Sequence, residues 1–254
     1  MTEESPTAAG VMAALAERAD ASDAEFLQGF FKTGAGQYGE GDVFIGVRVP
    51  QIRAVAKRFI GLSEAQASVL LDSEVHEHRL TALVIAVLQF ERAGRSAARD
   101  DVLRRRLHVA YLDAARRGRV NNWDLVDTSA EYLVGEYLYD TGAGDAGSEL
   151  LRRLAASPSL WERRVAVLAT FGFIKHGEAG PTLDLAPRLL DDPEDLMHKA
   201  VGWMLREVGK RVDRAELVGF LDEYASRMPR TMLSYATEHL SPPERAAYRA
   251  LPRK

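Results

Sequence analysis

The chain has 254 residues, of which 46% are hydrophobic and 28% are charged, and its formal net charge is −4. This balance is typical of a soluble globular protein, and the absence of cysteine excludes disulfides, cysteine-ligated zinc and thiol catalysis. No apolar run approaches the roughly 18 residues that span a bilayer, and the acidic N-terminus lacks the features of a signal peptide. We therefore expect a cytoplasmic protein with no membrane partner. We expect a single domain over 1–254, with residues 1–7 and 251–254 disordered.

Helical patterns dominate the chain from its first segment to its last. Apolar residues recur with a period of 3.6, for example over 80–88, 165–169 and 201–208. Helix starts are indicated by Ser22 and by Ser63, which forms a capping-box pattern with Gln66. Further starts are indicated by six prolines, namely Pro50, Pro158, Pro181, Pro193, Pro229 and Pro242. The pattern predicts about a dozen helices with short connections.

Residues 33–48 are the exception, because they contain five glycines and show no helical period. Gly39-Glu40-Gly41-Asp42 has the composition of a turn, and Val43-Phe44-Ile45 favours extended structure. A short β-hairpin or an ordered loop is expected here. A flexible connector is the alternative, although Tyr38 and the apolar residues 43–45 could anchor the segment.

Only three tryptophans occur, Trp123, Trp161 and Trp203, and they are 38 and 42 residues apart. That period suits an array of stacked helix pairs. Residues 76–83 also resemble residues 161–168, with a looser third copy at 197–202. An array of this kind would place equivalent helices side by side.

The copies share a cation near the start of a helix, at Arg79, Arg164 and Lys199. Positive charge there opposes the helix macrodipole, so its recurrence needs another cause. An anion-binding groove is one interpretation, and solvated helix ends with incidental charges are the other. The negative net charge of the whole chain argues against nucleic-acid binding. It is a weak test, because nucleic acids bind to a local basic face of a protein. The excess of arginine over lysine suits phosphate binding, and a GC-rich genome would explain it equally well.

Trp123 and Asp127 are four residues apart and would share one helix face. An aromatic ring and a carboxylate together suit a cationic group or a transition state that develops positive charge. Lys199 and Arg164 could hold phosphate nearby, and Trp203 could add a second aromatic wall. The alternative is a buried tryptophan with a carboxylate that caps a turn or pairs with an arginine.

Other site chemistries find no support in the sequence. His76 and His78 lie on different helix faces, and no third ligand has zinc-site spacing. The glycine-rich stretch fits neither a phosphate-binding P-loop nor a dinucleotide fingerprint, and no serine-nucleophile motif occurs. We expect no cofactor and no metal.

Four short motifs in order resemble the AlkD-like DNA alkylation-repair glycosylases over residues 25–240. They are Gly46-Val47-Arg48-Val49-Pro50-x-x-Arg53, Asn122-Trp123-Asp124-x-Val126-Asp127, Trp161-x-x-Arg164 and Lys199-Ala200-x-Gly202-Trp203-x-x-Arg206-Glu207. The resemblance implies an all-α, right-handed superhelical solenoid of HEAT-like helix-pair repeats with a groove for double-stranded DNA. It implies monofunctional, hydrolytic excision of cationic N3- and N7-alkylated purines. We expect the protein to be a monomer.

Matched motif by motif, the resemblance implies that Asp127 is the catalytic carboxylate and that Trp123 and Trp203 wall the lesion. The expected DNA contacts are Arg164, Lys199, Arg48, Arg79, Arg163 and Arg206. Trp161 would instead anchor the helix that presents Arg164.

The Thr33–Ile45 segment departs from the best-known relatives and is similar to an insertion in relatives proposed to engage branched DNA without glycosylase activity. Three hypotheses therefore stand. The first is an alkylpurine glycosylase, the second is a non-catalytic module that binds branched or damaged DNA, and the third is a protein–protein scaffold.

Overall fold

The computed structural model describes residues 5–252, and the chain folds into two compact units, Met1–Ser129 and Ala130–Lys254. Within residues 5–252 the secondary structure is helical without a β-strand, which confirms the all-α prediction. The disorder expected at 1–4 and 253–254 lies outside the described residues. Thr7 is ordered enough to cap the first helix through its hydroxyl. No described helix is long and apolar enough to cross a membrane.

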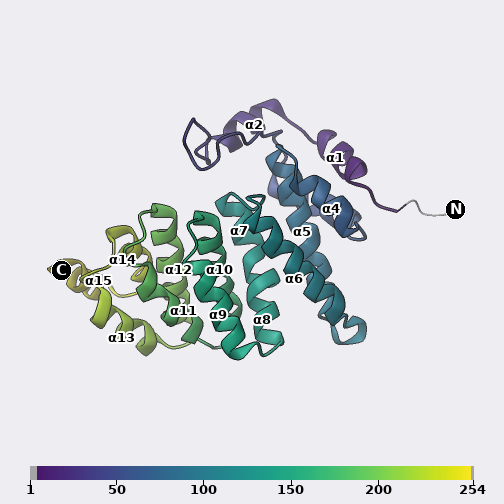
Figure 1. The fold of residues 1–254 in the computed structure, drawn as a ribbon. Coiled ribbons are helices and arrows are strands. Elements are labelled where there is room, and N and C mark those ends of the chain that lie inside the picture. Colours follow the sequence, from purple (N-terminus) through teal and green to yellow (C-terminus); the bar gives the residue numbers. More distant parts are fainter. Residues whose placement is uncertain (1–4, 253–254) are drawn as a thin grey trace. The chain divides into compact units, whose positions relative to one another are not determined.

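The described part of the first unit is built from seven α-helices and one 3-10 turn (Figure 1). They are α1 (Ala8–Ala16), α2 (Ala21–Gln28), α3 (Val49–Arg58), α4 (Glu64–Leu71), α5 (His76–Ala93), η1 (Ser96–Ala98), α6 (Asp101–Arg116) and α7 (Trp123–Ala130). Helix α5 is the centre of this unit, because it packs against α1, α3, α4 and α6. Its buried side chains include Leu80, Leu83 and Ile85, as the 3.6-residue period predicts.

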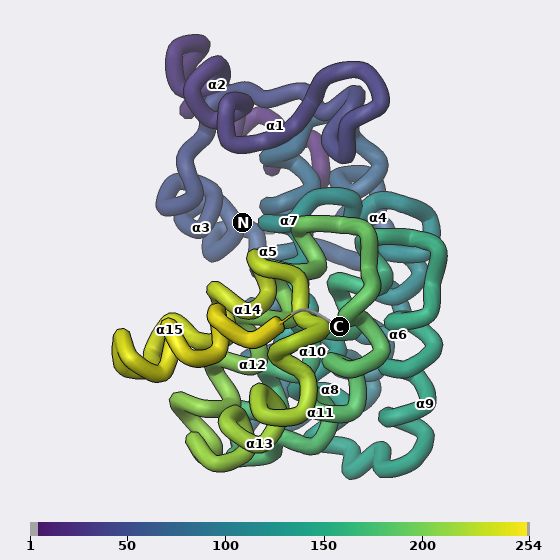
Figure 2. The backbone as a smooth tube through the Cα atoms, turned by 90° about the vertical axis from the view of Figure 1, so that its left-hand side faces the viewer, coloured from purple at the N-terminus to yellow at the C-terminus, as the bar shows by residue number. Residues whose placement is uncertain are grey.

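The second unit begins with a π-helical segment, η2 (Glu131–Glu136). The remaining elements are α8 (Tyr137–Asp140), α9 (Gly144–Ala155), α10 (Leu160–Lys175), α11 (Gly180–Leu185), η3 (Ala186–Leu189), α12 (Asp195–Arg211), α13 (Arg214–Tyr224), α14 (Arg230–Ala236) and α15 (Pro242–Ala250). Helix α10 packs against η2, α9 and α12, and α12 packs in turn against α13 and α14. Figure 2 shows α14 running beside α12.

The three segments that resemble one another in sequence form the central helices α5, α10 and α12, and the same turn precedes each. The Ser73 hydroxyl accepts a hydrogen bond from the Val75 amide, and the Ser157 hydroxyl accepts one from Ser159, both at 3.1 Å. Asp192 accepts from the Glu194 amide at 3.0 Å. In every case the capping side chain lies three residues before the helix starts. The repeat therefore has a local structural cause in these side chain–backbone turns.

Proline and serine signals place most helix starts correctly. Pro50, Pro181 and Pro242 lie in the first turns of α3, α11 and α15, since proline suits the start of a helix. Ser63 caps α4, but Gln66 does not close a capping box, because its side chain accepts a hydrogen bond from the Ala8 amide at 2.7 Å. The Ser22 prediction is wrong, because Asp20 caps α2 instead.

The α2–α3 loop (residues 29–48) is ordered and is not a hairpin. Val43 forms an isolated parallel bridge with Val75, and the two backbone hydrogen bonds are Val43 N to Glu74 O at 3.1 Å and His76 N to Val43 O at 2.8 Å. The extended residues thus pair with the segment before α5 rather than with a second arm of the loop. Gly46 has a φ of +79°, and a β-carbon there would lie 2.0 Å from the Asp20 carbonyl oxygen. Only glycine fits this position.

A close crossing of two helices stabilises the second unit. A β-carbon on Gly135 in η2 would lie 2.1 Å from the Ala169 carbonyl oxygen of α10, and one on Gly172 would lie 2.7 Å from the Glu136 amide nitrogen. The two glycines face each other, so the backbones of η2 and α10 touch without intervening side chains. A similar approach brings α14 onto Gly202 of α12.

Gly135→Ala should destabilise this crossing, because the new methyl group meets rigid backbone. We expect the free energy of unfolding, measured by urea denaturation, to fall by about 3 kcal/mol. Gly219→Ala is the control, since a β-carbon at this position in α13 meets nothing within 4 Å. It should be neutral or stabilise by up to about 1 kcal/mol through helix propensity. Equal stability of the two variants would contradict the close-packing argument.

Candidate functional site

Trp123 and Asp127 lie on α7, and both residues are half-buried. Four residues at the helical rise separate them by about 6 Å along the axis, on one face. Burial raises the pKa of the Tyr111 phenol on α6, the hydrogen bond with Ser129 lowers it, and the negative charge of Asp127 raises it further. The Ser129 hydroxyl lies 3.1 Å from the Tyr111 hydroxyl, which ties the end of α7 to α6.

The α2–α3 loop is anchored by the carboxylate of Glu77, in the first turn of α5. This carboxylate accepts backbone hydrogen bonds from Ile45 at 3.1 Å, Gly46 at 2.9 Å and Val47 at 3.3 Å. Glu77 is only 2% exposed, so the three amides compensate for the desolvation of its charge. The loop therefore closes over the start of α5.

Asp42 carries the second anchor of the loop. Its carboxylate accepts from the Arg79 guanidinium at 2.6 Å and from the Asn122 amide at 3.1 Å, and it lies 3.4 Å from His76 Nδ1. Burial alone would raise the pKa of Asp42, but its contacts with His76, Arg79 and Asn122 outweigh burial and lower it. Asp42 thus stays charged and links the loop to α5 and to the residue that precedes α7.

An aromatic stack covers part of Trp123. The Phe31 ring of the α2–α3 loop stacks on the indole with centroids 5.3 Å apart and an interplanar angle of 20°. Phe44 in turn stacks on Phe31 with centroids 4.9 Å apart. Part of the Trp123 ring is therefore covered from within the protein.

The sequence indicates Phe44 among the possible anchors of the loop but assigns no such role to Phe31, Asp42 or Glu77, and His76 was considered there as a metal ligand. Within residues 5–252 no group of three histidine, aspartate or glutamate side chains is arranged to hold a metal ion. For Phe31 and Asp42 the available signal was the apolar and acidic character of the loop segment, and Glu77 carried no signal because its partners lie about 30 residues away.

Arg79 and Arg164, two of the predicted DNA contacts, are buried in the protein. Both residues are only 4% exposed. Arg79 pairs with Asp42, and the Arg164 guanidinium donates to the Leu196 carbonyl at 2.6 Å. Lys199 in turn pairs with Asp195 at 2.9 Å. Each of these cations therefore has an acceptor within the protein, in a buried contact for Arg79 and Arg164 and in an exposed ion pair for Lys199. These acceptors explain why positive charge recurs near helix starts.

Arg163 and Arg206, which are also among the predicted DNA contacts, form ion pairs within the protein. Arg163 donates to the Asp192 carboxylate at 2.7 Å and to the carbonyls of Ser157 and Pro158. Arg206 pairs with the carboxylates of Glu207 and Glu238. Burial alone would raise the pKa of Glu207, but Arg211 and Arg206 outweigh burial and lower it. These arginines join neighbouring turns and helices.

Arg48 and Lys199 remain accessible among the predicted cations, with side chains 54% and 41% exposed. The Arg48 guanidinium forms two hydrogen bonds with Asp23 and lies 5.8 Å from the Phe26 ring centroid. Exposed pairs of this kind contribute little to stability, so a phosphate can compete for the cation.

Trp203 is half-buried on α12 and lies 6.3 Å from Phe171, ring centroid to centroid. The Arg211 guanidinium lies 5.2 Å from the same Phe171 ring. Trp161 is 9% exposed on α10, in keeping with a packing role. Trp203 belongs to the second compact unit, whereas Trp123 and Asp127 belong to the first.

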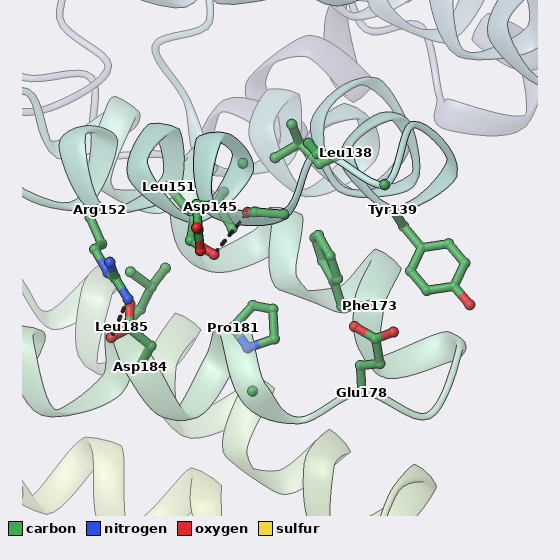
Figure 3. Close-up of a pocket in the computed structure, with 16 residues that line it drawn as sticks. Leu138, Tyr139, Asp145, Leu151, Arg152, Phe173, Glu178, Pro181, Asp184 and Leu185 are labelled. Carbon is green, nitrogen blue, oxygen red and sulfur yellow. Dashed lines mark hydrogen bonds and ion pairs between the residues drawn. The ribbon is translucent and has the colours of Figure 1, made fainter.

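A pocket of about 540 Å³ opens in the second unit between α8, α9 and α11 (Figure 3). Leu138, Phe173 and Pro181 form apolar walls, and Glu178 and the Arg152–Asp184 ion pair lie at its edge. None of the predicted site residues lines it. The residues that line the pocket belong to the second unit, whereas Trp123 and Asp127 belong to the first.

A family model described as "DNA alkylation repair enzyme" matches residues 11–240. Among solved structures, the chain is similar to a "Predicted DNA alkylation repair enzyme from Enterococcus faecalis", with a TM-score of 0.66 and 15% sequence identity. The match covers 89% of this chain and 98% of that one, and at this identity it bears on the fold alone. No curated protein matches the chain significantly.

Glu77→Ala should release the α2–α3 loop, because it leaves three backbone amides without their acceptor. We expect a loss of about 2–4 kcal/mol in the free energy of unfolding, and faster amide hydrogen exchange at residues 45–47. Glu64→Ala is the control, since its pair with Arg106 is exposed and worth about 1 kcal/mol or less. Unchanged exchange at 45–47 in the Glu77 variant would disprove the anchor.

Proposed function

This chain belongs to the DNA alkylation repair enzyme family, and on that premise we propose that it is a DNA glycosylase that removes cationic N3- and N7-alkylated purines. The observation that supports this most is the presentation of Trp123 and Asp127 by one turn of α7. Both side chains are partly exposed, and the helix that carries them is tied to α5 at its start and to α6 at its end.

The chemistry of an alkylated purine suits a lone carboxylate. Alkylation at N3 or N7 makes the base positively charged, so it leaves with the electrons of the glycosidic bond and needs no protonation. The barrier that remains is the positive charge that develops on the sugar, and a fixed carboxylate stabilises such charge electrostatically. Water adds its oxygen to the sugar carbon and loses a proton to complete the hydrolysis. Asp127 is the proposed carboxylate in this step.

Trp123 and Trp203 are the proposed aromatic contacts, since electron-rich rings attract both a cationic base and an oxocarbenium-like sugar. Arg48 and Lys199 are the proposed phosphate contacts, because they combine positive charge with exposure. The proposed partner is alkylated double-stranded DNA. The proposal requires neither a cofactor nor a metal ion.

The α2–α3 loop favours a second candidate function, a non-catalytic module that binds branched or damaged DNA. Phe31 occupies one face of Trp123 and so reduces the aromatic surface left for a lesion. The same loop exposes Phe30, which is 58% accessible and available for contact with unstacked bases. A protein–protein scaffold is the third reading, and it predicts no salt-dependent affinity for DNA.

Asp127→Asn should abolish base release from methylated duplex DNA while duplex binding persists. The substitution keeps the shape of the side chain and removes the charge that stabilises the sugar cation. We expect a loss of at least about 100-fold in single-turnover rate, measured as free 7-methylguanine and 3-methyladenine.

Asp113→Asn is the control, because Asp113 forms an exposed ion pair on α6 and is not part of the proposed site. Its rate should match the wild type. A wild-type protein that binds methylated duplex but releases no base would favour the DNA-binding module over the glycosylase.

Lys199→Gln should reduce the salt dependence of DNA binding. Loss of one phosphate contact lowers the slope of log K against log salt concentration by about 1. Arg163→Gln should leave that slope unchanged, because Arg163 is already occupied by Asp192. Fluorescence anisotropy with a labelled duplex at several salt concentrations measures both slopes. Equal slopes for the wild type and the Lys199 variant would remove Lys199 from the interface.

A further inference from the structure

His76, the first residue of α5, is held between two carboxylates from different segments. Its Nε2 lies 2.7 Å from Asp124 in the first turn of α7, and its Nδ1 lies 3.4 Å from Asp42 in the α2–α3 loop. The His76 side chain is 3% exposed, so solvent screens these two contacts little. Three separate segments of the chain thus meet at one imidazole ring.

Aromatic rings also connect His76 with Trp123 in the first turn of α7. Phe44 stacks on the imidazole with centroids 4.8 Å apart and an interplanar angle of 22°. The Phe31 ring lies 5.0 Å from the imidazole, 4.9 Å from Phe44 and 5.3 Å from Trp123, centroid to centroid. His76 therefore supports Asp124 through a hydrogen bond and Trp123 through the Phe31 ring.

The charges around His76 favour its protonated form. Asp124 faces it from α7, Asp42 faces it from the loop, and the cation Arg79 lies near it on α5. Burial alone would lower the pKa of His76, but the two carboxylates outweigh both burial and Arg79 and raise it to about 9. Both ring nitrogens can then donate a hydrogen bond to a carboxylate at neutral pH.

We infer that His76 is a positioning residue for the proposed reaction: by joining Asp42 to Asp124 it holds the first turn of α7 and thereby aims Trp123 and Asp127. This inference rests on the proposed function. In this scheme His76 does not touch the substrate and acts through Asp124 and the aromatic stack. Since Trp123 and Asp127 share one helix face, a small rotation of α7 displaces both groups together.

The test compares His76→Gln with His78→Gln in the full-length protein. His78 is the matched control, because it lies on the same helix and its ring contacts Ser73 at 2.9 Å, outside the His76 contacts. The readout is kcat and KM for base release from methylated duplex DNA between pH 6 and 10. Circular dichroism establishes that each variant is folded under the assay conditions.

We expect His76→Gln to lower kcat by about 10- to 100-fold, since a displacement of the order of 1 Å has effects of this size. KM should stay within about twofold, because DNA contacts elsewhere persist. A histidine whose pKa is raised in the folded protein stabilises its surroundings fully at a pH below its ordinary pKa. This stabilisation is lost as the pH rises through the raised pKa, because the imidazole then loses its charge. Wild type and His78→Gln should therefore lose kcat as pH rises through about 9, and His76→Gln should lack that step.

A folded His76→Gln variant with wild-type kcat at neutral pH would overturn the inference. Asp124→Asn provides a second route, because it keeps a hydrogen-bond acceptor for His76 and removes one charge. It should retain more kcat than His76→Gln and move the step to lower pH. A step that stays in place in Asp124→Asn would also overturn the inference.

The proposed function can fail separately from the positioning role. If the wild type releases no base, the fluorescence of Trp123 reports the position of α7 in a Trp161→Phe, Trp203→Phe background. We then expect its emission to change with pH through about 9, and to lose that change when His76→Gln is added. A pH-independent emission with His76 present would overturn the positioning role itself.

Discussion

The first unit depends on the pairing of charges that have been removed from water. Asp42, Arg79 and His76 are nearly inaccessible, and each would be strongly destabilising if it were buried alone. Together they connect the α2–α3 loop with α5, and through Asp124 with α7. Because hydrogen bonds and ion pairs of this kind are directional, they determine the relative orientation of the three segments as well as the stability of their association. The stacked rings of Phe44, Phe31 and Trp123 add packing contacts between the same segments.

The features that could be predicted from sequence are those with local causes. A 3.6-residue apolar period and proline at the first turn act within a few residues of the chain, so the helices around Pro50 and Pro181 were correctly expected. The internal repeat was also visible, and the structure gives its cause in the turns capped by Ser73, Ser157 and Asp192. The spacing of Trp123 and Asp127 depended only on α7 being helical.

The features that could not be predicted depend on partners distant in sequence. Asp42 and Asn122 are 80 residues apart, and no periodicity relates them. The burial of Arg79 could not be predicted for the same reason, because the sequence shows that Arg79 is charged but not that Asp42 neutralises it. The sequence left a hairpin and an ordered loop open for residues 33–48, and the ordered loop is found because Val43 pairs with Val75, whose place beside the loop is a tertiary property. Propensity alone could not choose between these partners.

The geometry at Gly46 has a consequence for inheritance. Every single-nucleotide missense change in a glycine codon introduces a β-carbon, and there is no room for one against the Asp20 carbonyl. The codon for Gly46 therefore has no conservative neighbour in the genetic code. An exposed position such as Arg48 can change to a similar residue by a single-nucleotide substitution, whereas any missense change at Gly46 must move the start of α2 away from the loop.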